Sequence, residues 1–205
     1  MKSKQIFVLL LLLLSFVAVS HSQRNLASNK MFAIYWCGFS GNYCGQSTSD
    51  DVYEDATHVI MAFANANKDG TLSHGSMPTS LIKQWHNEGK KVILSIGGQE
   101  GHLYDIFQNP SNFVSSIYSI MSKYSLDGVD LDLEDYGSTP KQVITTLQKM
   151  RAKFGTKYEI FFTAENVTVY PSSVVSVPSV NTGGQFWNYM VPVLNQALQY
   201  IDYVQ

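Results

Sequence analysis

Apolar residues recur along this chain with two spacings, which predict two kinds of element. Short runs rich in β-branched and aromatic residues predict strands, some of them apolar on both faces as in a buried parallel sheet. These runs are residues 32–36, 58–64, 91–96, 127–134, 158–164 and 201–205. Apolar residues spaced three or four apart, with capping and breaking residues, predict helices over residues 50–56, 77–88, 111–123, 140–155 and 186–200, the last interrupted by Pro192. Alternating strands and helices predict parallel βα units.

Such units either close into a (β/α)8 barrel or stay open as a doubly wound sheet. No GxGxxG or GxxxxGK[ST] motif follows a strand, so the nucleotide-binding versions lack support. Carboxylates at the end of residues 127–134 lie where barrels keep their active sites. We therefore predict an α/β fold of the (β/α)8 TIM-barrel type, incomplete here, with five strands and the start of a sixth instead of eight.

Residues 127–134, with the sequence DGVDLDLE, carry the strongest chemical signal. The period of two along a strand places Asp130, Asp132 and Glu134 on one face, in steps of about 6.6 Å. Aspartate is depleted in strands, so folding alone does not explain this column. Stacked carboxyls cannot all ionise cheaply, and at least one pKa must rise. The pattern predicts a functional acidic cluster.

The spacing argues against a metal at this cluster. With Asp130 at position 1 of a calcium loop, Asp135 would stand at position 6, where the sharp turn needs glycine. The five histidines form no HxxH-type pair. We expect neither a metal nor any other cofactor.

The acidic stretch also resembles the DxxDxDxE signature of family 18 glycoside hydrolases. These are the chitinases, endo-β-N-acetylglucosaminidases and their inactive relatives. Four further segments resemble this family in the same order: AIYW at Tyr35, MAFAN at Phe63, KVILSIGG ending at Gly98, and FFTAEN at Glu165. The resemblance covers about residues 31–205 and is nearest to the small chitinases of the plant class III type. It implies a barrel that is truncated at its C-terminal end.

The resemblance also implies roles for the three carboxyls. Glu134 would protonate the leaving glycosidic oxygen and later activate water, while the substrate's own N-acetyl oxygen attacks the anomeric carbon. Asp132 would orient the acetamido group and stabilise the oxazolinium, and Asp130 would share a proton with Asp132. The implied function is a secreted chitinase that cuts β-1,4-linked N-acetylglucosamine polymers internally with retention.

Two other functions fit the same signature. An endo-β-N-acetylglucosaminidase would act on N-glycans, and a non-catalytic protein on the same scaffold would bind chitin or inhibit an enzyme. Such non-catalytic relatives often lose the acid, and the presence of Glu134 favours an enzyme. For the 205-residue chain itself we expect little activity, because the later strands of the family hold much of the substrate.

Four residues near the strand ends are further candidates for substrate binding. Tyr35 and Phe63 occupy inner strand positions, where they would contact the sugar or simply fill the barrel. Gly97 and Gly98 would let the backbone approach a ligand, although a plain turn also uses glycine. The sequence leaves both alternatives open.

Residues 1–22 have the features of a secretory signal peptide, with two lysines, a 14-residue apolar run and small residues before His21. An uncleaved signal anchor is the alternative, but the run is shorter than the roughly 20 residues that a membrane span needs. Residues 23–205 would then form a partial catalytic barrel, secreted and free of the membrane after cleavage.

The composition of residues 23–205 limits the partners that the mature chain would bind. The signal contains two lysines and no acidic residue, so the mature chain would have a net charge of about −4. It has no basic cluster in its sequence, which argues against nucleic acid as a partner. We expect chitin or N-acetylglucosamine oligosaccharides as ligands and a monomeric protein.

The chain has two cysteines, Cys37 and Cys44. In a secreted chain they would form a disulfide, or they would remain two thiols.

Overall fold

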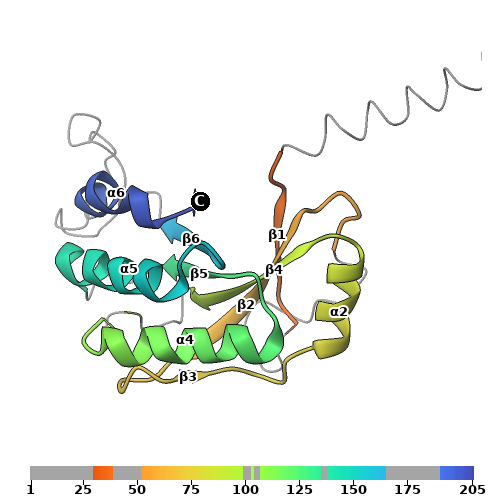
Figure 1. Ribbon diagram of the computed structural model, residues 1–205, viewed down its shortest axis with the longest axis horizontal. Helices are drawn as coiled ribbons and strands as arrows, with labels where there is room; N and C mark the ends of the chain where they lie inside the picture. Colours follow the sequence, from red (N-terminus) through yellow and green to blue (C-terminus); the bar gives the residue numbers. More distant parts are fainter. Residues whose placement is uncertain (1–29, 39–51, 99–102, 104–106, 135–137, 165–189) are drawn as a thin grey trace, which may run out of the picture. The chain divides into compact units, whose positions relative to one another are not determined.

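The computed structural model describes residues 30–38, 52–98, 103, 107–134, 138–164 and 190–205. Residues from Ala33 onward form one compact unit, an α/β fold built on a curled sheet (Figure 1). Its strands are β1 (Ala33–Trp36), β2 (His58–Ala66), β3 (Leu72–Ser73), β4 (Lys91–Gly97), β5 (Gly128–Leu133), β6 (Glu159–Ala164) and β7 (Tyr203–Val204). The order in the sheet is β1-β2-β4-β5-β6-β7, all parallel, and β3 pairs antiparallel with β2. The six predicted strands are thus confirmed, and β3 is an element that the pattern did not predict.

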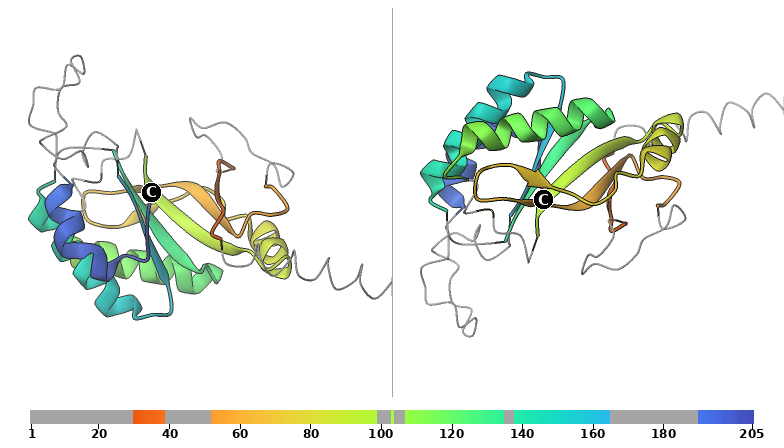
Figure 2. Two further views of the ribbon diagram at one scale, coloured as in Figure 1. Left: turned by 90° about the horizontal axis from the view of Figure 1, so that it is seen from above. Right: turned by 90° about the horizontal axis from the view of Figure 1, so that it is seen from below.

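The helices in the described part of this unit are α2 (Thr79–Asn87), α4 (Pro110–Tyr124), α5 (Pro140–Phe154) and α6 (Val191–Ala197), followed by a 3-10 turn at Leu198–Tyr200. Helices α4, α5 and α6 lie on one side of the sheet (Figure 2). Helix α5 begins as predicted, because Thr139 and Gln142 cap each other in a capping box. No helix in the described part of the chain is long and apolar enough to cross a membrane.

Two helix predictions are wrong in detail. Residues 52–56 form a bend and a turn rather than a helix, because so short a segment holds a helix poorly; residues 50 and 51 of that prediction lie outside the described residues. Pro192 lies in the first turn of α6, which begins at Val191, since its missing N–H costs nothing there. The predicted start of that helix, at residues 186–189, lies outside the described residues.

The curled sheet has a core on each side. The outer core lies between sheet and helices, and includes Trp36 packed edge-on against Trp85 of α2 at 5.3 Å between ring centroids. The inner, concave face is filled by Ile60, Ile93 and Phe161. Burial on both faces explains why residues 58–62 read as a continuous apolar run.

Two aspartates fix how the strands lie against each other. Asp127 directly precedes β5, and its N–H donates to the Val92 carbonyl (2.8 Å) while its carboxylate accepts the Val92 N–H (2.7 Å). Asp202 before β7 makes the same reciprocal pair with Ile160, at 2.8 and 2.7 Å. The first pair sets the register of β5 on β4 and so places the acidic column.

Candidate active site

Strand β5 presents the predicted column of carboxyls along the concave face of the sheet. Asp130 has no exposed surface, Asp132 is 6% exposed, and Glu134, just after the strand, is exposed. The neighbouring leucines and valine of β5 belong to the core on the opposite face. The column therefore runs from the interior to solvent, and Glu134 is the member that a substrate can reach.

Asp130 is held by hydroxyl groups from three other strands. Ser95 Oγ of β4 and Tyr35 Oη of β1 donate to its Oδ2, at 2.6 and 3.0 Å. Thr163 Oγ1 of β6 donates to its Oδ1 at 2.9 Å and also lies 3.0 Å from Tyr35 Oη. Three donors match an ionised carboxylate, which only accepts hydrogen bonds.

Burial and mutual charge set the protonation of this cluster. Burial raises the pKa of Asp130, and the three hydroxyl donors oppose that rise only in part. Burial and the charge of Asp130 raise the pKa of Tyr35, which keeps its phenol protonated as a donor. Burial, then the charges of Asp130 and Glu134 and a hydrogen bond with Glu134, raise the pKa of Asp132 to about 7. The predicted rise of at least one pKa thus occurs at Asp130 and Asp132.

Asp132 lies between the two other carboxyls of the column. Its raised pKa favours the protonated form, and Glu134 contributes to that rise through its charge and through a hydrogen bond. The hydroxyls of Ser95, Tyr35 and Thr163 occupy both oxygens of Asp130. The proton that the family resemblance places between Asp130 and Asp132 stays a prediction.

The glycine that ends β4 and the glycine that follows it pack against residues of the site itself. Gly97 has a φ of +115°, and a Cβ there would lie 2.1 Å from the Asp132 carbonyl oxygen. Gly98 has a φ of +75°, donates its N–H to that same carbonyl (3.0 Å), and a Cβ there would lie 3.0 Å from the Phe63 ring. The close approach of β4 to β5 therefore requires glycine at residue 97, and the positive φ and the Phe63 ring favour glycine at residue 98. Their predicted contact with substrate stays a prediction.

The two aromatic candidates lie beside each other at this end of the sheet. The rings of Tyr35 and Phe63 are 6.1 Å apart between centroids, and both side chains are partly buried. Tyr35 has a defined role as a donor to Asp130, while sugar contact by either ring stays a prediction. Cys37 directly follows β1, but Cys44 lies outside the described residues, as does Glu165.

Ser95 and Thr163 are the site residues that the sequence interpretation missed. Both lie within segments that resemble the family, SIGG and FFTAEN. In the sheet, Ser95 stands opposite Asp130, and Thr163 stands opposite Asp132. Counting back by two from Gly97 would have placed Ser95 on the inner face. Among the described residues, no group of three His, Cys, Asp or Glu side chains could hold a metal.

The pKa of Asp132 predicts how stability depends on pH. A folded-state pKa of about 7, against 3.8 for the ordinary group, means that the folded state keeps a proton that the unfolded state loses. The free energy of unfolding should therefore fall between pH 4 and 7. The full shift corresponds to about 4 kcal/mol, and we expect about half of it because solvent reaches the adjacent Glu134.

Urea unfolding of the wild type and of Asp132→Asn from pH 4 to 7.5 measures this effect. The wild type should lose about 2 kcal/mol relative to the variant over that range. Asp55→Asn, at an exposed position, is the control and should follow the wild type. Equal pH dependence in all three proteins would show that Asp132 does not hold a proton in the folded state.

Comparison with known proteins shows the family to which this chain belongs. Residues 31–205 match the family model of the glycosyl hydrolases family 18. The chain belongs to glycosyl hydrolase family 18. This agrees with the resemblance of the acidic stretch, while the plant class III subtype stays a prediction.

Relatives within family 18 support the match. A probable class II chitinase from Arthroderma benhamiae is 32% identical over 132 residues, which is 57% of this chain and 40% of that protein. Chitinase D from Niallia circulans is 32% identical over 133 residues, 57% of this chain and 24% of that protein. The chain thus spans less than half the length of these relatives.

A solved structure shows the same fold. The crystal structure of a family 18 chitinase from Chromobacterium violaceum superposes with a TM-score of 0.62 and 26% identity, covering 83% of this chain and 48% of the other. The curled parallel sheet therefore corresponds to part of a family 18 TIM barrel, and the predicted fold class is confirmed.

Proposed function

We propose that this protein is a chitinase that hydrolyses β-1,4-linked N-acetylglucosamine polymers by substrate assistance. One observation carries the proposal: the exposed Glu134 follows Asp132, whose pKa is raised, and a buried Asp130 that three hydroxyl groups bind, all along β5. Family 18 membership supports glycoside hydrolysis, and relatives named as chitinases support chitin as the substrate class.

The first chemical step follows from the order of the column. The proton of Asp132 passes to Glu134 when substrate binds, which leaves Asp132 as a carboxylate. Glu134 then donates that proton to the glycosidic oxygen as the bond from that oxygen to the anomeric carbon breaks. The oxygen of the substrate's acetamido group forms a bond to the same carbon, giving a positively charged oxazolinium. Asp132 accepts the acetamido N–H and stabilises that charge, with the charge of Asp130 behind it.

The second step restores the enzyme. Water attacks the anomeric carbon, the bond to the acetamido oxygen breaks, and Glu134 takes the proton from the water. Two displacements at one carbon give net retention of configuration. The rigid hydroxyl contacts of Asp130 hold the column in place through both steps.

A substrate comparison tests the proposed specificity against the N-glycan alternative. Chitotetraose and a high-mannose N-glycan are incubated with the chain and with a form extended to the length of its relatives. Chitotetraose should be cut to chitobiose, and the N-glycan should stay intact in mass spectra. Release of the glycan at its chitobiose core would identify an endo-β-N-acetylglucosaminidase instead, and binding of chitotetraose without cleavage would identify a non-catalytic protein.

We further propose that the protein is secreted, on the basis of the apolar, lysine-flanked segment at residues 1–22. Protein from the medium of a secreting host should begin near His21 or Gln23. Membrane-bound protein that retains Met1 would contradict the secretion proposal.

We also propose a disulfide between Cys37 and Cys44 in the secreted chain. Alkylation without reduction should leave both cysteines unmodified, as expected for a bridge. Two alkylated cysteines would contradict the bridge.

A further inference from the structure

The charges of this protein are segregated by element. The chain has 16 acidic and 14 basic residues, yet the four described helices contain no acidic residue. Their basic residues, apart from histidine, are Lys83, Lys123, Lys141, Lys149, Arg151 and Lys153. The outer helical surface is therefore basic although the whole chain is slightly acidic.

Helix stability accounts for only part of this composition. Lys123, Arg151 and Lys153 lie in the last turns of α4 and α5, where cations stabilise a helix through its dipole. Acidic residues in the first turn would stabilise a helix in the same way, and none of the four helices has one there. Lys149 and Lys153 lie four apart on α5, where like charges destabilise. The dipole therefore does not explain Lys149 or the absence of acidic residues.

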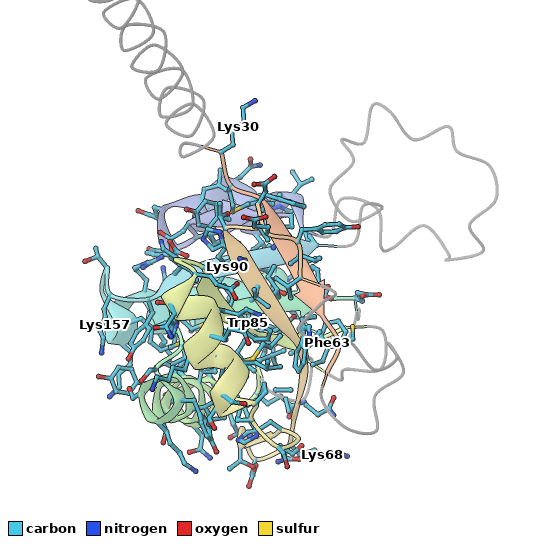
Figure 3. All side chains as sticks on the ribbon, turned by 90° about the vertical axis from the view of Figure 1, so that its right-hand side faces the viewer. Lys30, Phe63, Lys68, Trp85, Lys90 and Lys157 are labelled. Atoms are coloured by element: carbon cyan, nitrogen blue, oxygen red, sulfur yellow. The ribbon has the colours of Figure 1, made fainter. Side chains whose placement is uncertain are left out.

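Three exposed lysines lie toward the C-terminal end of α5 and just beyond it. They are Lys149 and Lys153 on the helix and Lys157 after it, here called the lysine stripe. Lys149 and Lys153 are about 6 Å apart along the helix axis, whereas Lys157 follows the turn at Gly155 that ends the helix. Lys157 projects from the outer surface of the protein (Figure 3). Lys153 and Lys157 lie over the Tyr118 and Tyr158 rings, whose centroids are 5.9 Å apart, so these cations share one surface.

The stripe faces α4 across the boundary between the two helices. Lys149 Nζ donates to Ser111 Oγ at 3.2 Å, and Lys153 Nζ lies 4.9 Å from the centre of the Tyr118 ring. Lys157 Nζ lies 4.7 Å from the Tyr158 ring. These contacts fix the direction of the side chains, while the charge of each ammonium has no carboxylate partner among the described ion pairs.

Arg151 of α5, unlike the lysines of the stripe, is held by contacts within the fold. Its guanidinium binds the carboxylate of Asp202 and the carbonyl oxygens of Gly155, Tyr158 and Tyr200. It holds the start of β7 to α5 and is occupied by the fold. The stripe lysines contact only Ser111 and two tyrosine side chains, and none has a carboxylate partner among the described ion pairs.

Two exposed serines of α4, Ser111 and Ser122, lie on the other side of this boundary. Ser122 Oγ lies 3.1 Å from Tyr158 Oη, and Ser111 meets the stripe through Lys149. Serine hydroxyls both donate and accept hydrogen bonds, as do the hydroxyls of a sugar.

We propose that the lysine stripe and the serines of α4 bind a linear polysaccharide that carries anionic groups on its sugars. The three cations complement carboxylates or sulfates that recur along a chain, and the serines at the boundary complement the sugar hydroxyls. This surface lies on the helices, apart from the carboxyl column on the concave face of the sheet, and would attach the protein to an acidic matrix polymer.

Two other polyanions fit the surface less well. Membrane insertion needs exposed apolar side chains, and the large exposed apolar residues of the described chain all lie outside α4 and α5. Single-stranded nucleic acid needs open aromatic faces. Here Tyr118 stacks on Phe154 and lies beneath Lys153, and Tyr158 meets both rings edge-on.

Binding to polygalacturonate tests the proposal. The stripe variant carries Lys149→Gln, Lys153→Gln and Lys157→Gln. The control variant carries Lys30→Gln, Lys68→Gln and Lys83→Gln, three exposed lysines outside the stripe, so both variants lose the same charge. Biolayer interferometry at low salt should show about a tenfold weaker affinity for the stripe variant and less than a twofold change for the control.

Further measurements separate the other outcomes. Wild-type affinity for polygalacturonate should fall with salt, and neutral dextran should not bind. Equal losses in both variants, or no binding by the wild type, would overturn the proposal. Tighter binding to phosphatidylserine vesicles or to a single-stranded oligonucleotide would assign the surface to those partners and overturn it too. Each single lysine variant is measured as well, so that a folding defect of the triple variant does not decide the result.

The catalytic proposal and the polysaccharide-binding proposal are tested by independent measurements. The stripe variant should hydrolyse chitotrioside at the wild-type rate. Glu134→Gln should bind polygalacturonate with wild-type affinity, because the carboxyl column takes no part in the stripe.

Discussion

Glu134→Gln is expected to lower the hydrolysis of a fluorogenic chitotrioside by at least about 10²-fold, the lower range for loss of a general acid. Glu134 is the exposed member of the column and the one that can reach the glycosidic oxygen. Glutamine keeps the shape and hydrogen-bonding capacity of the side chain but cannot donate a proton to that oxygen. The loss should therefore fall on kcat, while binding of chito-oligosaccharides changes little.

The control for this variant is Glu54→Gln, which removes an exposed carboxylate elsewhere. It should leave hydrolysis unchanged. Because this chain spans less than half the length of its curated relatives, rates are measured for the chain and for a form extended to their length. Near-wild-type activity of a correctly folded Glu134→Gln protein in both forms would show that another group is the acid.

Asp132→Asn is expected to lower the same rate by about 10²-fold or more, for a different reason. The amide cannot become an anion, so it cannot stabilise the positive oxazolinium that forms next to it. It also removes the group whose pKa is about 7, and with it the proton that passes to Glu134. The pH profile of kcat should therefore lose one ionisation.

Kinetics of Asp132→Asn from pH 4 to 9 provide the check. Asp55→Asn, at an exposed position, serves as the matched change of charge and should keep the wild-type profile. A profile of Asp132→Asn that keeps both its height and its shape would remove Asp132 from the mechanism.

The elements of this fold that depend on local pattern could be predicted from the sequence. The six parallel strands follow from short apolar runs, and the exposed end of the acidic column follows from the period of two along β5. The start of α5 follows from Thr139 and Pro140, whose effects are local as well. These features need no knowledge of the neighbouring strands.

What the sequence interpretation missed depends on contacts across strands. Ser95 and Thr163 bind Asp130 only because β4 and β6 lie on either side of β5 in one register. That register depends in turn on the reciprocal pairs of Asp127 and Asp202 with neighbouring strands. Which carboxyls have a raised pKa also depends on the neighbouring strands, because burial is the largest cause of the rise at both Asp130 and Asp132.

The stereochemistry of hydrolysis tests the central claim most directly. Proton NMR of the first products from chitotetraose reports the configuration at the newly freed anomeric carbon before mutarotation. Attack by the substrate's own acetamido oxygen predicts that the β anomer appears first, because two displacements occur at that carbon. Initial formation of the α anomer would mean direct attack by water. It would contradict the assignment of Glu134 and Asp132 to a substrate-assisted mechanism.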